Sequence, residues 1–367
     1  MIELSDLAAM MLERGNQKRY VRIESWLDDD LLSDDVPVIA AREEVDRSNN
    51  VPERLSFSVP RTAAGFDWTP TTDTHPLAAN GQRVRVLLGV GTGLDAEGAP
   101  RVEWLNRGWF VIYSAEANGD QVDVEAYGLL WLVQEARLVS PYQPAASSTF
   151  RSVLRDLMGP GVPAVFDGAL INRTVPSTIN YDDDRLGAVY ATLAAWPAEG
   201  QVTEDGYFLV SPAADASVVS LALTDGRGGT VVRAAGVSTR EGAYNAVVAR
   251  GTAADGGQVQ GVAYDTGGPK RVGGPFNDLP VPYYYDSPLL TTQAQAQAAA
   301  KTRLATIKRQ TSSTYTVEMV PHPALQTGDL VTLTTEHFTA LPAIVEALVL
   351  PYNPDGGSQT LTVRSTT

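Results

Sequence analysis

The sequence predicts a mainly β protein of several domains, in which strand-rich regions near both ends flank α+β and loop-rich segments. Three observations lead to this fold class. Apolar residues alternate with polar ones at a period of two over long stretches of both end regions. Helical periodicity is confined to a few segments. The chain has 367 residues, more than the roughly 250–300 that one hydrophobic core usually supports, so we expect at least two domains.

Residues 20–140 are predicted to form mostly strands. Apolar residues alternate over 83–88, and the segment WFVIYSAEANGDQVDVEAYG is typical of a hairpin with an Asn-Gly turn at 118–119. Its second arm carries Asp123 and Glu125. Residues two apart share one face of a strand, whereas paired catalytic carboxylates face each other across a cleft. We therefore interpret this acidic pair as a solvated strand face.

The N-terminal segment MIELSDLAAMMLERG predicts an amphipathic helix rather than a signal peptide, because it lacks a basic start and a long apolar core. Its expected apolar face consists of Leu4, Leu7, Ala8 and Met11. The most apolar stretch, GLLWLV, is only as long as a strand and falls short of the roughly 20 residues of a membrane-spanning helix. We expect no membrane segment and a protein made in a cytosol.

Residues 141–230 predict a small α+β unit. The segment PYQPAASSTFRSVLRDLMGPG predicts a helix with Ser148 as N-cap and a stop at Gly159-Pro160. A second helix is predicted in DDDRLGAVYATLAAWP, whose initial acids suit the helix dipole, and EDGYFLVSP predicts a turn into a strand. The expected buried stripes of the two helices are Phe150, Val153, Leu154 and Leu157, and Leu186, Val189, Tyr190 and Leu193.

Residues 225–280 are rich in glycine and proline and predict long surface excursions of the kind that bind or assemble, around one embedded strand, AYNAVVARG. The segment TTQAQAQAAAKTRLATIKRQ then predicts a helix that begins with a capping box of Thr292 and Gln295. Its expected buried face is Ala296, Ala300, Leu304 and Ile307, and its basic residues are Lys301, Arg303, Lys308 and Arg309. The remaining residues return to strands and end in a hairpin arm, PDGGSQTLTVRS.

The stretch PHPALQTGD, within TYTVEMVPHPALQTGDLVTL, could be a chemical site or only a connection between two strands. Alternation over 314–319 predicts the first strand, and the prolines at 321 and 323 end it because proline cannot donate a ladder hydrogen bond. Gly328-Asp329 is typical of a turn into the next strand. His322, alone between two prolines, is interpreted as a loop residue rather than a ligand.

Composition and charge exclude several functions. The formal net charge is −15, and the 28 Lys and Arg residues are scattered rather than gathered in a basic stripe. Such a surface repels phosphate backbones, so specific nucleic-acid binding is not expected. The chain has no cysteine, which rules out a disulfide framework, a thiolate zinc site and a cysteine nucleophile.

Motifs that carry chemistry are missing from the sequence. His75, His322 and His337 lie far apart, without the spacing of a zinc site. GVGTG at 89–93 has neither P-loop nor dinucleotide-binding spacing, and we interpret it as a flexible hairpin tip. The two DDD runs lack the EF-hand pattern; the run at 28–30 reads as a turn and that at 182–184 as a helix start. We expect no catalytic, cofactor-binding or metal-binding residues, and no cofactor.

The segment PVPYYYDSP places Tyr283, Tyr284 and Tyr285 on a predicted loop. Clustered tyrosines can stack on sugars or anchor a protein interface, because each offers a rigid ring with a hydrogen-bonding tip. They can also simply cover the adjacent helix. We favour packing within the chain or between subunits over a ligand-binding role.

Several segments, in their order along the chain, resemble tail-hub proteins of long-tailed bacteriophages, especially minor tail proteins of phages of actinobacteria. In the C-terminal half these segments are STREGAYNAVVARG, GGPFNDLPVPYYYDSPLLTTQAQAQAAAKTRL and VPHPALQTGDLVTL. In the N-terminal half they are NGQRVRVLLGV, WLNRGWFVIYSAEANGDQVDVEAYGLLWLV, TFRSVLRDLM and RLGAVYATLAAW. The match of order covers nearly the whole chain, and its specificity lies in the series rather than in any one motif.

The resemblance implies two tube-like β-barrels per chain. Residues 1–140 would form the first barrel and 141–230 a small α+β domain, while 231–250 and 310–367 would form the second barrel and 251–309 a loop-rich insertion with a helix. In this family the Pro-to-Gly-Asp stretch links two strands of the second barrel and has no catalytic role.

The resemblance also implies a non-enzymatic baseplate role at the tail tip of a virion. Three chains would form a homotrimer of pseudo-sixfold symmetry between the sixfold tail tube or distal ring and a threefold tip, a closed ring through which DNA passes. Its implied partners are the distal tail and tube proteins, the tape measure protein and tail-tip spike or fibre proteins. Two alternatives stay open: a carbohydrate-binding or cell-wall-cleaving tail-tip protein, and a sixfold distal ring with one barrel per chain.

Overall fold

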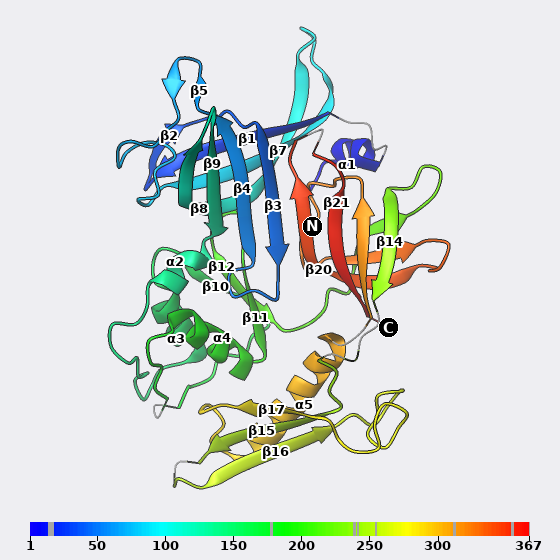
Figure 1. Cartoon of the computed structure of the whole chain (residues 1–367). Coiled ribbons are helices and arrows are strands. Elements are labelled where there is room, and N and C mark those ends of the chain that lie inside the picture. Colours follow the sequence, from blue (N-terminus) through cyan, green and yellow to red (C-terminus); the bar gives the residue numbers. More distant parts are fainter. Residues whose placement is uncertain are drawn as a thin grey trace.

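A computed structural model describes residues 1–366 except 14–17, 177–178, 238–239, 241, 254, 311–312 and 354–355. The expected motif residues Ser238, Thr239 and Glu241, and the Pro354-Asp355 start of the last hairpin arm, lie outside the described residues. Strands dominate and helices are few, which confirms the prediction of a mainly β, multi-sheet fold. The largest sheet has 13 strands, and the two ends of the chain both reach it (Figure 1).

The first half of this sheet forms one strand unit, which we call unit 1. Its strands pair in the order β2-β1-β7-β8-β9-β4-β3. They span β1 (Arg19–Leu27), β2 (Asp30–Ser33), β3 (Ala40–Asp46), β4 (Glu53–Pro60), β7 (Arg83–Leu94), β8 (Pro100–Asn118) and β9 (Gln121–Gly128). A small hairpin of β5 (Thr62–Ala63) and β6 (Phe66–Asp67) is inserted between β4 and β7.

The second half, unit 2, repeats the arrangement. Its strands pair in the order β13-β19-β20-β21-β18-β14, which matches β1-β7-β8-β9-β4-β3 both in space and along the chain. They span β13 (Val219–Thr224), β14 (Val231–Val237), β18 (Thr314–Met319), β19 (Leu330–Thr334), β20 (Leu341–Pro351) and β21 (Gln359–Ser365). Two differences stand out: β13 runs parallel to β19 whereas β1 and β7 are antiparallel, and β2 has no counterpart.

The repeat extends to register and irregularities. Strands β8 and β20 each carry a bulge, after Ile112 and after Val345, at the same place relative to their neighbours. The strands before them in the chain, β7 and β19, each follow a glycine at positive φ: Gly81 (+120°) lies before β7 and Gly328 (+90°) before β19. Glycine adopts such a φ without the strain that a side chain would cause, so the same backbone feature recurs in both units.

The two units are joined edge to edge. Strand β20 of unit 2 pairs antiparallel with β3 of unit 1, from Ala347 opposite Asp46 to Pro351 opposite Arg42. Before their bulges β8 pairs with β7 and β20 pairs with β19. After the bulges both strands belong to one antiparallel layer, which we call the front sheet, in the order β8-β9-β4-β3 followed by β20-β21-β18-β14 (Figure 1). Buried residues of both units pack behind it as a single core. Among the described residues the pairings follow an open path from β14 to β2.

The α+β region between the units has its own core. It contains α2 (Leu130–Glu135), α3 (Phe150–Met158), β10 (Ala164–Phe166), α4 (Arg185–Ala195), β11 (Ala198–Val202) and β12 (Phe208–Pro212). The predicted stripes of both helices are buried apart from Tyr190, which is partly buried. One expectation is wrong, because the N-cap of α3 is Thr149, which completes a capping box with Ser152, and not Ser148. The apolar stretch GLLWLV runs from the end of β9 into α2.

The insertion into unit 2 is a small separate layer. Strands β16 (Gln258–Tyr264), β15 (Ala246–Thr252) and β17 (Pro282–Asp286) form a three-stranded sheet that packs on α5 (Gln293–Gln310) through the face predicted for this helix. The capping box of Thr292 and Gln295 is confirmed. Our placement of the 246–250 strand in the second barrel is wrong, because β15 pairs with β16 and β17 only. Conversely, β13, which we placed in the α+β region, pairs with β19.

The N-terminal helix α1 (Asp6–Glu13) is confirmed, but its inward face is shifted. Ala8 and Leu12 are buried, whereas Leu7 is 47% exposed. The GVGTG segment is also not a hairpin tip, because residues 89–93 lie within β7. Gly89 needs to be glycine for packing: a Cβ there would lie 2.4 Å from Cγ1 of Val102 on the neighbouring strand.

Candidate functional site

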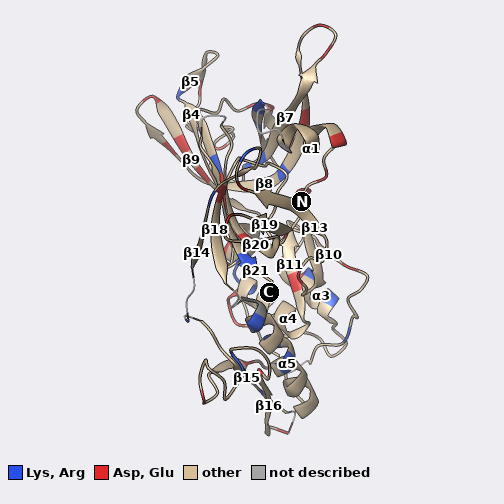
Figure 2. Cartoon of the chain, turned by 90° about the vertical axis from the view of Figure 1, so that its right-hand side faces the viewer, with Lys and Arg blue, Asp and Glu red and all other residues tan. Residues whose placement is uncertain are grey.

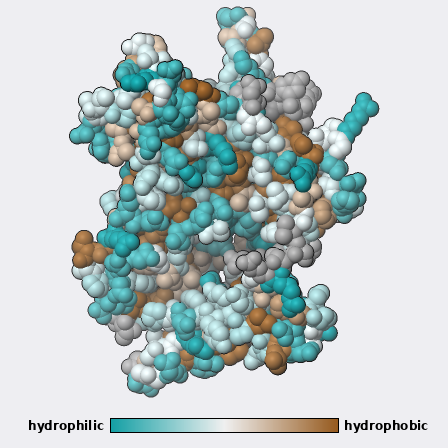
Figure 3. Space-filling model, in the orientation of Figure 1, coloured by the Kyte–Doolittle hydropathy of each residue, from teal (hydrophilic) through white to brown (hydrophobic). Residues whose placement is uncertain are grey.

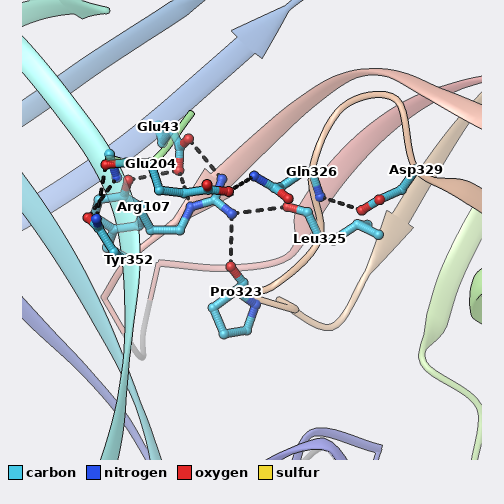
Figure 4. Close-up of polar contacts among 10 residues, drawn as sticks. Glu43, Arg107, Glu204, Pro323, Leu325, Gln326, Asp329 and Tyr352 are labelled. Carbon is cyan, nitrogen blue, oxygen red and sulfur yellow. Dashed lines mark hydrogen bonds and ion pairs between the residues drawn. The ribbon is translucent and has the colours of Figure 1, made fainter. Parts of the chain in front are cut away.

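A buried ion pair ties the two units together at their joint. The side chain of Glu43 projects inward from β3, where it accepts two hydrogen bonds from Arg107 of β8, at 3.0 Å from Nε and 2.8 Å from Nη2. Tyr352 donates its hydroxyl to the same carboxylate at 2.8 Å. Burial alone would lower the pKa of Arg107, but the attraction of Glu43 outweighs this and raises it. Arg107 therefore stays charged, and the pair is a bidentate bond across the core (Figure 4).

The proline-containing stretch between β18 and β19 completes this junction. Arg107 donates through Nη1 to the carbonyl oxygens of Pro323 (2.9 Å) and Leu325 (3.1 Å), so all its nitrogens have partners. Gln326 then donates to Glu204, which reaches in from the β11–β12 turn (Figure 4). PHPALQTGD is thus the connection that fastens unit 2 to unit 1 and to the α+β region.

Asp329 fixes the end of the same stretch. Its carboxylate accepts hydrogen bonds from the backbone N–H of Gln326 at 2.8 Å and from the N-terminal amine of Met1. The N–H of Gly328 donates to the carbonyl of Val345 at 2.7 Å, and the N–H of Val345 donates back to the carbonyl of Asp329 at 3.0 Å. The first residue of the chain is therefore anchored at the turn before β19.

His322 is a core residue of this connection. It is 7% exposed, and its backbone N–H donates to Oε1 of Gln359 at 2.7 Å. Burial lowers the pKa of His322 to about 4, so the ring is neutral at neutral pH. His322 therefore lies in the connection between two strands, as we interpreted it, but its burial could not be predicted from the neighbouring prolines. Among the described residues, no group of three or more histidines, acids or cysteines could hold a metal ion.

The outward face of the front sheet is polar and acidic in unit 1. In β3, β4 and β9, buried residues alternate with outward ones. The outward charged residues of unit 1 include Arg42, Glu44, Asp46, Arg54, Asp123 and Glu125. Asp123 accepts from Ser58 at 2.6 Å and Glu125 pairs with Arg54 at 2.7 Å, so the predicted solvated strand face is confirmed. Figure 2 shows acidic bands along this part of the sheet.

Unit 2 carries a different outward face. There the outward positions of β18 and β21 are occupied mainly by Thr314, Thr316, Thr360 and Thr362. Hydrophobic residues on this side of the molecule are scattered in small groups rather than collected in one large patch (Figure 3). Small apolar residues share this face, among them Ala347 and Val349 of β20 opposite Asp46 and Glu44. A surface without one large apolar patch is suited to face water rather than to pack against another protein core.

The tyrosine segment is a strand and not the predicted loop. Tyr283 and Tyr285 of β17 pack toward α5, each within 6 Å of the guanidinium of Arg303. This confirms the packing role that we favoured for two of the three rings. Tyr284 points the other way, is 53% exposed, and has the guanidinium of Arg250 at 4.5 Å from its ring.

A cleft of about 1080 Å³ separates the α+β region from α5 and the front sheet. Glu53, at the start of β4, lies on its wall. Burial raises the pKa of Glu53 to about 7, and its Oε2 atom has no hydrogen-bond partner among the residues that the structure describes. The wall of this cleft therefore carries a buried carboxyl that titrates near neutral pH.

The junction residues were missed from the sequence, although one signal was available. In AAREEVD the alternation that puts Ala41 and Val45 inward also puts Glu43 inward. A charge in the apolar phase of a strand needs a buried partner, but only the fold shows that this partner is Arg107. Of the other histidines, His75 is buried and bonded to the 67–77 loop, and His337 is exposed beside Glu336. No helix among the described residues is long and apolar enough to cross a membrane.

Comparison with solved structures gives the same fold in phage tail proteins. A tail protein from Neisseria meningitidis matches with a TM-score of 0.66 at 13% identity, covering 94% of this chain and 96% of that one. A 43 kDa prophage tail protein from Shewanella oneidensis matches at 0.58 and 10% identity, covering 93% and 97%.

A prophage tail protein from Listeria monocytogenes matches with a TM-score of 0.58 at 11% identity, covering 94% of each chain. No protein-family model matches the sequence, and no curated protein does either. At such low identity the likeness is one of fold, and it spans the whole chain rather than one domain.

Proposed function

We propose that this protein is a structural component of a phage tail, and specifically a hub whose copies form a ring at the distal end of the tail. The observation that carries this is the presence, in one chain, of two strand units with the same order and register, joined edge to edge. A chain with two such units can close a threefold ring that presents six units to a sixfold tube.

The front sheet would line the channel of this ring. Its outward face is acidic in unit 1 and rich in threonine on β18 and β21 of unit 2, and an acidic surface repels the phosphate backbone and lets DNA pass without binding it. The proposed neighbours are the tail tube or distal ring on one side, and the tape measure protein and spike or fibre proteins on the other. The proposal assigns no enzymatic activity to the chain.

The repeat argues against the alternative in which six chains form a distal ring. A ring of six chains needs one unit per chain to match a sixfold tube, whereas this chain supplies two. Immunogold labelling of intact particles with an antibody against the chain tests the proposed place in the tail. Label at the tail tip is the expected result, and label along the tube or on the capsid would refute a hub role.

A further inference from the structure

The joint between the two units has a defined geometry. Residues 42–46 of β3 pair antiparallel with 347–351 of β20. Backbone hydrogen bonds bracket the joint, from the N–H of Arg47 to the carbonyl of Glu346 at 3.2 Å and from the N–H of Tyr352 to the carbonyl of Ala41 at 2.9 Å. The side chain of Asn353 then caps the start of β3 by accepting from the N–H of Ala41 at 2.7 Å.

Each half of this joint has an equivalent elsewhere in the chain. On one side, Ala41 lies opposite Phe57 as Ala234 lies opposite Val317, so β14 occupies the place of β3. On the other side, Ser114 resumes the ladder after the bulge of β8 as Ala347 does after that of β20. Residues 114–118 of β8 therefore correspond to 347–351 of β20.

Both equivalent halves are open edges. Strand β14 ends the sheet path and pairs only with β18, and residues 114–118 of β8 pair only with β9 among the described residues. They lie at opposite ends of the front sheet, β14 at one end and β8 with β9 at the other (Figure 1). An open edge with free backbone donors and acceptors is a template for pairing with another strand.

We propose that a second copy of this chain fills this edge: β14 of one copy pairs antiparallel with residues 114–118 of β8 in the next, in the register of the β3–β20 joint. Gly236 would lie opposite Ala117, and Ala235 opposite Asn118. This inference rests on the proposed ring, and it specifies which strands and residues close it.

Charge at the two edges agrees with this register. Asp120 lies in the two-residue turn that follows Asn118 and closes the β8–β9 hairpin. The register sets Ala235 opposite Asn118, so Arg233 of β14 would lie beside this turn and close to Asp120. Both residues are exposed and carry opposite charges, which favours this alignment over a slip by one residue, because such a slip would turn every side chain to the other face.

A cysteine pair tests the register directly, because the chain has no cysteine of its own. Ala235 and Asn118 would form a pair without mutual hydrogen bonds, whose Cα atoms lie about 4.5 Å apart in antiparallel sheets, within the range of a disulfide. The full-length chain carrying Ala235→Cys is mixed with the chain carrying Asn118→Cys at tens of micromolar and oxidised with copper phenanthroline. The product is then separated on a denaturing gel.

Matched controls define the outcome. Arg42→Cys with Pro351→Cys places the same pair in the joint within the chain and should oxidise without a change in mass. Asn118→Cys mixed with Tyr264→Cys, an exposed residue of the inserted sheet, should give only background. The expected result is a covalent dimer from the Ala235 and Asn118 pair, at least tenfold above that background.

A yield of covalent dimer no higher than that of the Tyr264→Cys control would refute the proposed pairing of β14 with β8. If the protein without cysteines is then still a trimer by light scattering, the proposed register is wrong but the hub role is not. Immunogold label away from the tail tip would instead contradict the hub role itself. A charge exchange adds a second readout: Asp120→Arg should reduce the cross-link severalfold, and adding Arg233→Asp on the partner chain should restore it. A cross-link that ignores both changes would contradict the alignment.

Discussion

Units 1 and 2 share an architecture and differ in what is attached to it. Strand order, register, the bulge in β8 and β20, and the glycine before β7 and β19 recur in both. The insertions do not recur: unit 1 carries the β5–β6 hairpin between β4 and β7, and unit 2 carries the β15–β17 layer with α5 between β14 and β18. The repeated part joins the two units side by side within the chain, and in the proposed ring it would also join neighbouring chains.

The two joints differ in how firmly they are held. The joint within the chain has Glu43 bonded to Arg107 and Tyr352, with Leu348 and Leu350 buried beside it. The equivalents at the open edges are Gly236, Ala115 and Ala117. The proposed pairing between chains would therefore depend on backbone hydrogen bonds and charge, without a counterpart of Glu43. This difference suits a permanent joint inside the chain and a joint between chains that forms during assembly.

Breaking the ion pair should have the largest effect. Arg107→Ala leaves Glu43 and two carbonyl groups buried without their donor, which should lower the free energy of unfolding by about 3–5 kcal/mol. Urea unfolding followed by tryptophan fluorescence measures the loss. The double variant Arg107→Met with Glu43→Leu is the control, because removing both charges should cost less than removing one. Equal losses would mean that the ion pair does not hold the joint.

Glu53 should make the stability of unit 1 depend on pH in a way that unit 2 does not share, because Ser313 occupies the equivalent position in unit 2. Its folded pKa is about 7, above the ordinary value of 4.5. The protonated form is therefore favoured by folding, and this contribution is full below pH 4.5 and lost as the pH rises through 7. Glu53→Gln should stabilise the protein at pH 8 by on the order of 1–3 kcal/mol and change little at pH 4.5. Equal effects at both pH values in urea unfolding would refute the buried carboxyl.

The glycines before β7 and β19 test whether the two units are equivalent in backbone strain. Gly81 and Gly328 both have positive φ, which a β-branched residue adopts only at a cost. Gly81→Val and Gly328→Val should each lower the melting temperature, with a loss of about 1–3 kcal/mol. Asn at either position should cost less, since asparagine tolerates this conformation. If either valine variant is as stable as the wild type, the positive φ at that glycine is not a constraint that the two units share.

The tyrosines of β17 should show the smallest effect. Tyr284→Ala removes an exposed ring and should change stability by less than about 0.5 kcal/mol, whereas Tyr285→Ala, which faces α5, should cost more. Titration with soluble cell-wall fragments tests the carbohydrate-binding alternative at the same time. Saturable binding that is lost in Tyr284→Ala but kept in Arg303→Ala would favour that alternative over a purely structural role.

Local patterns predicted the elements but not their assembly. The alternation of β9 and the stripe of α5, such as Ala300 and Leu304, follow from periodicity, and the structure confirms them. The repeat could not be seen in the same way, because equivalent core positions hold different residues, as with Phe57 and Val317 or Val122 and Gln359. What is conserved between the units is pairing, and pairing over long sequence distances leaves no local signature.

The errors have the same origin. GVGTG was interpreted from its composition, but its glycines lie in β7, where Val102 crosses closely. The tyrosine run flanked by prolines forms the strand β17 because β15 offers it a parallel edge. In both cases tertiary contacts override local preference.

The mass of the protein in solution is the decisive measurement for the proposed hub, because two joined units per chain should close a ring of three chains. Light scattering at micromolar and at tens of micromolar concentration should give three times 39.2 kDa, with Asp120→Arg shifting the equilibrium toward the monomer. A hexamer, or a monomer at every concentration, would contradict the account.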